Sequence, residues 1–257
     1  GDTLGSAAAL CHILRRMGKT AYIYNNPETT AKYLPWTTPY HAPSDFVPDC
    51  CIGIDLASER LFPKGLDETT HFELCIDHHP TNTGYAQRVW CLPTKASCGE
   101  LILMLANELD MLDKTVADLL YIAVSTDCGC FVYANTTDET HIAAAELIAA
   151  GADHRGLNIT LFRQFSFSRL MLEGLIYSSM RRYADGYVNV ATVTLEMMER
   201  SGATENDCDD LASLAGRVEG GYVSVTIREL GERECKLSLR SGQDFDSSAI
   251  CALHGGG

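Results

Sequence analysis

The chain has 257 residues, 46% of them hydrophobic, and a formal net charge of −14 at pH 7. A chain of this length and composition can bury a substantial core and fits one large domain or two smaller ones. The negative charge argues against nonspecific binding to long nucleic acids, because such binding relies on clustered Lys and Arg side chains that neutralise phosphates. No stretch approaches the roughly 20 uncharged apolar residues of a membrane-spanning helix, and no signal-peptide pattern opens the sequence, so we expect a soluble protein without membrane contact.

The cysteine content predicts reduced thiols rather than a disulfide framework. There are eleven cysteines, an odd number, and most of them lie within apolar patterns of a long chain. Disulfide frameworks are typical of short secreted chains with an even count. We therefore expect a cytoplasmic protein.

The first part of the chain alternates predicted helices and strands. Apolar residues recur at helical spacing from Ser6 to Met17, and short apolar runs at 20–24, 50–56 and 72–77 predict strands. Ser97 followed by Glu100 is typical of a helix start, and two further helical patterns cover 115–127 and 137–152. This alternation predicts an α/β fold, with a mostly parallel sheet covered by helices on both faces.

The pattern changes after Asp153. A long amphipathic stretch at 167–183 predicts a connecting helix, and strand patterns follow at 187–195, 222–230 and 234–241 with a helical segment at 207–218. We therefore expect a first domain at 1–160, a connecting segment at 161–185 and a smaller α+β domain at 186–257.

Acidic and histidine side chains gather at the ends of the predicted elements. Asp2 precedes the first helix, Asp55 ends "CCIGID", Asp77 to His79 end "FELCIDHH", and Asp127 ends "YIAVSTD". One aspartate after a strand is usually a helix cap or a turn residue. In an open α/β sheet, however, the carboxyl ends of several strands meet at one crevice, so we expect these four points to converge.

A cluster of carboxylates and imidazoles points to metal-ion chemistry. Crowded carboxylates repel one another and would take up protons without a cation. Mixed carboxylate and imidazole ligands suit Mn²⁺ better than Mg²⁺ or Ca²⁺, which prefer oxygen. Two ions about 3.5–4 Å apart can bind both sides of a phosphodiester and activate water. We expect two Mn²⁺ ions, with Mg²⁺ or Co²⁺ as substitutes, and phosphoester hydrolysis.

The ordered set of motifs resembles a known family. The motifs are "GDTLGS" at Gly1–Ser6, "DHH" at Asp77–His79, "STDCGCF" at Ser125–Phe131 followed by "NTT", and "SLRS" followed by "GGG" near the end. Together they resemble the DHH phosphoesterases that carry a C-terminal DHHA1 domain, and most closely the branch that acts as oligoribonuclease and 3′-phosphoadenosine-5′-phosphate phosphatase. The resemblance spans nearly the whole chain.

The resemblance implies roles for individual residues of the first domain. Four of them would be metal ligands, namely Asp2, Asp55, His78 and Asp127. Asp77 would orient a histidine, and His79 would lie next to the scissile phosphate, where it donates a hydrogen bond or assists the leaving group. The family pattern also has a His and an Asp upstream of Asp2, which a polypeptide beginning at Gly1 would lack.

In the second domain the resemblance implies a substrate site. Arg240 and Ser241 match a phosphate-binding position, and Gly255, Gly256 and Gly257 match a glycine run that lets the backbone approach a nucleotide. Two simpler interpretations stay open at this point. The glycines alone are typical of a flexible chain end, and Arg240 alone is typical of a solvated strand residue.

These observations predict an enzyme with small substrates. We expect a metal-dependent phosphoesterase, able to form a homodimer, that hydrolyses short oligoribonucleotides and 3′-phosphoadenosine-5′-phosphate and does not bind long duplex nucleic acid. The alternatives are a phosphodiesterase for cyclic or linear dinucleotides, an inorganic pyrophosphatase, and a nucleotide-binding protein without catalytic activity.

Overall fold

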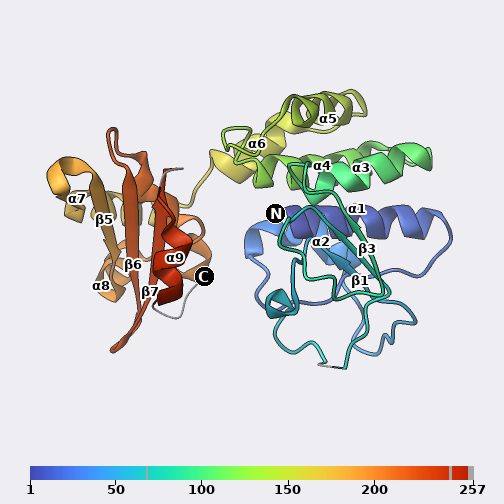
Figure 1. The fold of residues 1–257 in the computed structure, drawn as a ribbon, viewed down its shortest axis with the longest axis horizontal. Coiled ribbons are helices and arrows are strands. Elements are labelled where there is room, and N and C mark those ends of the chain that lie inside the picture. The colour runs from blue at the N-terminus through green and yellow to red at the C-terminus, as the bar shows by residue number, and fades with distance from the viewer. Residues whose placement is uncertain (68, 243–244, 254–257) are drawn as a thin grey trace. The chain divides into compact units, whose positions relative to one another are not determined.

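The computed structural model of the chain describes residues 1–67, 69–242 and 245–253 (Figure 1). The chain divides into two compact units, Gly1–Gln164 and Phe165–Gly257. Within the described ranges, no helix is both long and apolar enough to cross a membrane.

The first unit contains a small parallel sheet. Its strands are β1 (Ile52–Ile54), β2 (Leu74–Asp77) and β3 (Arg88–Cys91), in the order β1-β2-β3. The predicted parallel sheet is therefore confirmed. The predicted strand at 20–24 is wrong, because Ile23 forms only an isolated bridge with His41. Parallel strands are usually joined through a helix, yet the described residues between β1 and β2 form no α-helix and contain the 3₁₀ turn Glu59–Leu61.

Helices cover one face of this sheet. They are α1 (Asp2–Arg16), α3 (Cys98–Glu108) and α4 (Lys114–Asp127), with α5 (Asp138–Ala149) and α6 (His154–Phe162) packed on α4 and the short α2 (Leu34–Thr37) near α1. Successive strand residues point to opposite faces, so Ile76 joins the helical core while Cys75 packs with Phe72 and Ala86. That second face is covered by connecting segments, which corrects the expectation of helices on both faces.

Two helices approach each other closely in this core. A Cβ atom added at Gly5 of α1 would lie 2.6 Å from the carbonyl oxygen of Leu119 in α4 and 2.9 Å from the amide nitrogen of Ala123. A glycine is required where two backbones come this near. A Cβ atom added at Gly1 would overlap Thr126. The start of α1 therefore lies against the end of α4.

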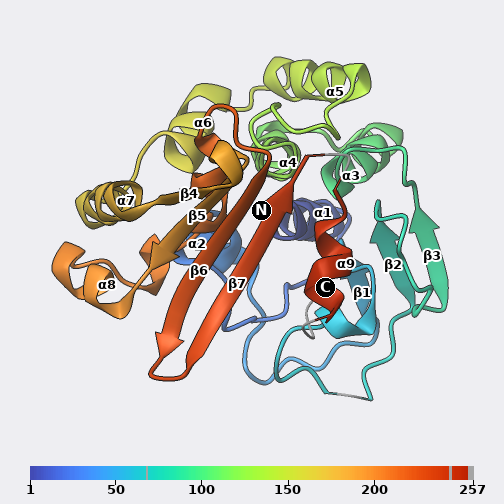
Figure 2. The same ribbon diagram turned by 60° about the vertical axis from the view of Figure 1, so that its left-hand side comes forward.

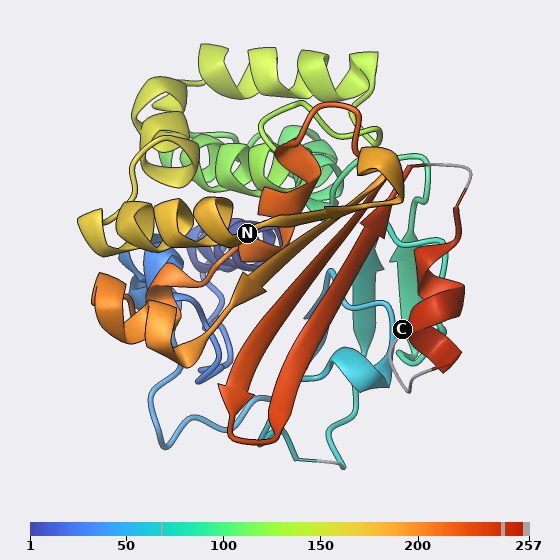
Figure 3. The ribbon, with the colours of Figure 1, turned by 90° about the vertical axis from the view of Figure 1, so that its left-hand side faces the viewer.

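The second unit is an α+β fold. Its sheet has the order β4-β5-β6-β7, in which β5 and β6 are parallel and the outer pairs are antiparallel. The strands are Arg181–Tyr183, Val188–Val193, Val223–Gly231 and Glu234–Ser241, and the helices are α7 (Phe167–Ser179), α8 (Leu195–Ser201) and α9 (Ser247–Leu253). Figure 2 shows α7 and α8 on the β5 side of the sheet, and Figure 3 shows the long hairpin of β6 and β7.

The helix α7 belongs to the second unit. Leu172 and Ile176 are fully buried against Ala191 and Val193 of β5 and Leu214 of the 3₁₀ segment Leu211–Arg217. The helix ends at Ser179, and the last three residues of the predicted helix, Arg181–Tyr183, form β4. The division of the chain falls after Gln164, at the start of the segment that was expected to connect the domains.

Candidate metal centre

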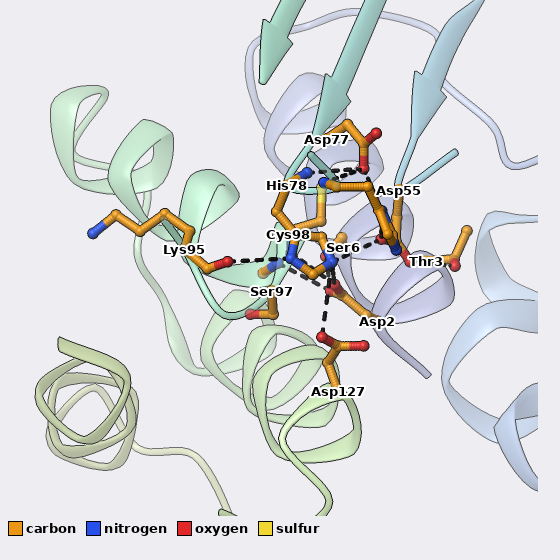
Figure 4. A network of polar contacts seen from close by, with 12 residues as sticks. Asp2, Thr3, Ser6, Asp55, Asp77, His78, Lys95, Ser97, Cys98 and Asp127 are labelled. Atoms are coloured by element: carbon orange, nitrogen blue, oxygen red, sulfur yellow. Dashed lines mark hydrogen bonds and ion pairs between the residues drawn. The ribbon is translucent and has the colours of Figure 1, made fainter. Parts of the chain in front are cut away.

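Asp2 is held by the first turn of another helix. Its carboxylate accepts hydrogen bonds from the amides of Cys98 (2.6 Å) and Gly99 (3.0 Å) at the start of α3, and from Ser6 Oγ (2.8 Å; Figure 4). The first amides of a helix lack partners inside the helix and carry a partial positive charge. Asp2 is thus a buried carboxylate with a fixed orientation that joins α1 to α3.

Asp55 follows β1 and turns back toward Asp2. Its backbone is left-handed (φ 58°), a conformation that is uncommon for residues other than glycine. Thr3 Oγ1 donates to Asp55 Oδ2 at 2.6 Å, whereas Asp55 Oδ1 is buried and accepts no hydrogen bond from the described residues. A buried carboxylate oxygen without a hydrogen bond costs free energy unless a positive charge faces it, so this atom fits a ligand of a cation.

His78 directs a ring nitrogen into a ring of carboxylates. Its Nδ1 lies 3.2 Å from the main-chain oxygen of Lys95, and this hydrogen bond leaves Nε2 as the inward-facing atom (Figure 4). Nε2 is buried without a hydrogen bond among the described residues, at distances of 3.4, 3.7 and 3.8 Å from carboxylate oxygens of Asp55, Asp127 and Asp2. A carbonyl that fixes one ring nitrogen so that the other can bind an ion is the usual arrangement of metal-binding histidines.

The geometry fits a divalent cation. Two overlapping sets of residues could each hold an ion, Asp55–His78–His79 and Asp2–His78–Asp127. Within each set, one ligand atom per residue lies within 4.8 Å of the others. The pKa of Asp2 is raised to about 8 by burial and by the nearby Asp55 and Asp127. Burial alone would lower the pKa of His78, but its contact with Asp55 and the charges of the neighbouring carboxylates raise it to about 9. Both shifts have the same cause: the crowded carboxylates favour a positive charge between them, which a divalent cation would supply.

Asp77 organises the segment that carries both histidines. It is fully buried, and its Oδ1 accepts from His79 Nδ1 (2.7 Å) and from the amide of His78 (2.8 Å), while Oδ2 accepts from Asn82 Nδ2 (2.6 Å). Burial favours the neutral acid, but these hydrogen bonds outweigh it and lower the pKa of Asp77 to about 2. Because Nδ1 of His79 faces Asp77, its Nε2 points away, and the side chain is 39% exposed.

Asp127 is the last residue of α4, and the side-chain amide of Asn135 donates to its Oδ2 at 3.2 Å. Burial and the proximity of Asp55 raise its pKa, although His78 opposes this shift. The strand-end argument therefore accounts for Asp55 and Asp77–His79, but Asp2 and Asp127 reach the same place from the ends of helices.

The six predicted site residues of the first unit lie together. In the second unit, Arg240 and Ser241 are on β7, where Arg240 is exposed and Ser241 Oγ donates to the carbonyl of Phe245. Gly255, Gly256 and Gly257 lie outside the described residues. The roles assigned to all of these residues stay predictions.

Sequence reasoning overlooked the residues that orient the cluster. Thr3 and Asn135 lie inside motifs that were recognised, "GDTLGS" and "NTT", but no role followed from spacing alone. Asn82 and the carbonyl of Lys95 carried no signal, because main-chain acceptors and loop amides become visible only once the chain is folded.

Comparison with known proteins identifies the family. The model of the DHH family N-terminal domain matches residues 1–124, which include Asp2, Asp55 and the Asp77–His79 tripeptide. The bifunctional oligoribonuclease and PAP phosphatase NrnA of Thermus thermophilus is 32% identical over 259 residues, covering the whole chain and 78% of that protein. The chain belongs to the DHH family.

Less similar proteins also match most or all of the chain. The protein of the same name from Bacillus subtilis is 25% identical, and the match covers the whole of this chain and 82% of the Bacillus subtilis protein. In fold, the structure of an exopolyphosphatase-related protein from Bacteroides fragilis matches with a TM-score of 0.86 at 21% identity, over 98% of this chain and 78% of that one. The DHH resemblance is confirmed, while the second unit lies beyond the matched segment and its DHHA1 assignment stays a prediction.

Proposed function

We propose that this protein is a cytoplasmic, metal-dependent phosphoesterase that hydrolyses short oligoribonucleotides and 3′-phosphoadenosine-5′-phosphate. Relatives from two bacteria are named for these two activities, and both are similar over the whole chain. The observation that carries the proposal is the convergence of three carboxylates on Nε2 of His78, a buried atom that forms no hydrogen bond with the described residues.

Four residues would hold the metal. They are Asp2, Asp55, His78 and Asp127, whose mixed oxygen and nitrogen donors suit Mn²⁺, with Mg²⁺ or Co²⁺ as substitutes. When bound, two such ions supply positive charge for the phosphoryl oxygens and lower the pKa of an attacking water.

His79 would act on the substrate directly. Asp77 holds Nδ1 of its ring, so the ring presents Nε2 away from the buried aspartate. With a proton on each nitrogen, the ring donates from Nε2 to a phosphoryl oxygen and can pass that proton to the leaving oxygen. Asp77 orients the ring and stabilises its positive charge, a role often found for a carboxylate behind a catalytic histidine.

The second unit would select the substrate. Arg240 and Ser241 are proposed to bind a terminal phosphate through charge-assisted hydrogen bonds. With a net charge of −14 the chain offers no extended basic track for successive phosphates, so each nucleotide beyond the first few gains little binding energy. The expected homodimer stays a prediction.

A panel of RNA lengths tests this function. Metal-free protein supplied with Mn²⁺ should hydrolyse RNA of about two to five nucleotides and 3′-phosphoadenosine-5′-phosphate, with kcat/KM falling steeply for longer chains. Asp127→Asn should nearly abolish turnover, whereas the exposed Asp45→Asn should leave it unchanged. Arg240→Ala should raise KM at unaltered Mn²⁺ affinity. Full turnover without metal, or equal kcat/KM for a 2-mer and a 24-mer, contradicts the proposal.

A further inference from the structure

The side chain of Asn135 connects two segments of the metal centre. It lies in the turn between α4 and α5, and its Nδ2 is 3.0 Å from the carbonyl oxygen of Ala96, 3.2 Å from Asp127 Oδ2 and 3.3 Å from the carbonyl oxygen of Asp127. An amide NH₂ has two protons. The two closest acceptors therefore accept one proton each, and the carbonyl oxygen of Asp127 shares one of these protons. One side chain thus connects the end of α4 to Ala96.

The segment that begins at Ala96 supports the other ligands. The preceding residue, Lys95, provides the carbonyl that orients His78, and the following residue, Ser97, caps α3 by accepting the amide of Glu100. The first amides of α3 then bind the carboxylate of Asp2. A shift of Asp127 relative to this segment would change its distance to both His78 and Asp2.

The loop before Asn135 has an unfavourable backbone. After α4 the chain passes through three consecutive left-handed residues, Gly129 (φ 54°), Cys130 (φ 57°) and Phe131 (φ 66°). The left-handed conformation is unfavourable for residues other than glycine, because the Cβ atom approaches a backbone oxygen. The reversal is closed by the amides of Val132 and Tyr133, which both bond to the carbonyl of Cys128. This turn returns Asn135 to the end of the helix that carries Asp127.

We propose that Asn135 is a positioning residue that sets the orientation of the Asp127 carboxylate and its spacing from His78 and Asp2. The inference rests on the proposed metal-dependent function. The amide acts through Asp127 and contributes no ligand of its own in this arrangement. Partners that orient a metal ligand typically contribute a factor of about 10–100 in metal affinity, and because Asn135 is exposed, the lower end of that range is expected.

Mn²⁺ affinity of matched variants tests the assignment. Asn135→Ala and the similarly sized Asn135→Leu both remove the donor. The control is Asn107→Ala, because Asn107 also donates from an exposed amide to a carboxylate on a neighbouring helix, Glu146 Oε1 at 2.7 Å, but lies at the other end of α3. Titration calorimetry gives the Kd for Mn²⁺, the electron paramagnetic resonance spectrum reports ligand symmetry, and thermal melting of the metal-free proteins reports folding.

The Kd should rise about tenfold or more in both Asn135 variants, with a changed resonance spectrum, and should stay within about twofold of wild type in Asn107→Ala. Melting temperatures of the metal-free variants should fall no further than that of the control. A Kd within twofold of wild type in an Asn135 variant, an equal rise in the control, or failure of both Asn135 variants to fold overturns the positioning role. Absence of Mn²⁺ binding by the wild-type protein overturns the proposed function as well.

Discussion

From the close contact of α1 with α4 at Gly5 we predict that a larger residue at this position alters both protein stability and metal binding. In Gly5→Ala the new methyl group would lie 2.6 Å from the Leu119 carbonyl oxygen and 2.9 Å from the Ala123 amide nitrogen. Ordinary van der Waals contact begins near 3.4 Å, so the shortest contact is too close by about 0.8 Å. Both neighbours are backbone atoms that cannot rotate away, and therefore the two helices must separate.

The energetic consequence can be isolated with a second substitution. Overpacking of this kind costs about 1–3 kcal/mol, while replacing a helical glycine by alanine contributes about 1 kcal/mol of stability. Gly174 in α7 offers the same substitution without the clash, since no described atom lies within 4 Å of a Cβ atom placed there. Gly174→Ala should therefore stabilise the protein, and Gly5→Ala should be less stable than Gly174→Ala by about 1–3 kcal/mol.

Separation of these helices should also weaken the metal centre. Asp2 begins α1 and Asp127 ends α4, and metal–ligand distances tolerate only about 0.2 Å. Urea unfolding and Mn²⁺ titration of the two alanine variants measure both effects. We expect a raised Kd for Mn²⁺ in Gly5→Ala and an unchanged one in Gly174→Ala. If Gly5→Ala gained as much stability as Gly174→Ala, the close helix contact would be refuted.

Two further predictions concern the caps and buried charges. Asp77→Asn should lower the free energy of unfolding by about 2–4 kcal/mol, because a buried acceptor of several hydrogen bonds becomes partly a donor; a loss below 1 kcal/mol in urea unfolding would contradict this. Asp113 caps α4 by accepting the amide of Val116, so Asp113→Ala should cost about 1 kcal/mol at pH 7. Burial alone would raise the pKa of Asp113, but its hydrogen bonds from Val116 and His12 lower it. The stabilisation is therefore present above the unfolded-state pKa and declines as the pH falls below about 4; an equal penalty at pH 7 and at pH 3 would argue against this cap.

Local sequence determined the strands and the tripeptide at their end. The apolar run before Asp77 forms β2 because alternate residues bury on both faces of the sheet, and the change to polar residues marks the edge where Asp77–His79 lie. The cap at Ser97 was readable for the same reason, since its partner is only three residues away. By contrast, residues 20–24 have a strand-like composition but form only an isolated bridge, between Ile23 and His41.

The construction of the metal centre was decided by tertiary structure. Asp2 meets the amides of Cys98 and Gly99 across nearly 100 residues of sequence, and Asp127 arrives from the end of a helix rather than from a strand. Both placements depend on how closely α1 and α4 can pack, which the missing side chain of Gly5 permits. A residue pattern can predict which side chains bind metal, but the distances among them arise from packing between segments that are remote in the chain. Such contacts have no periodicity or spacing that a single sequence displays.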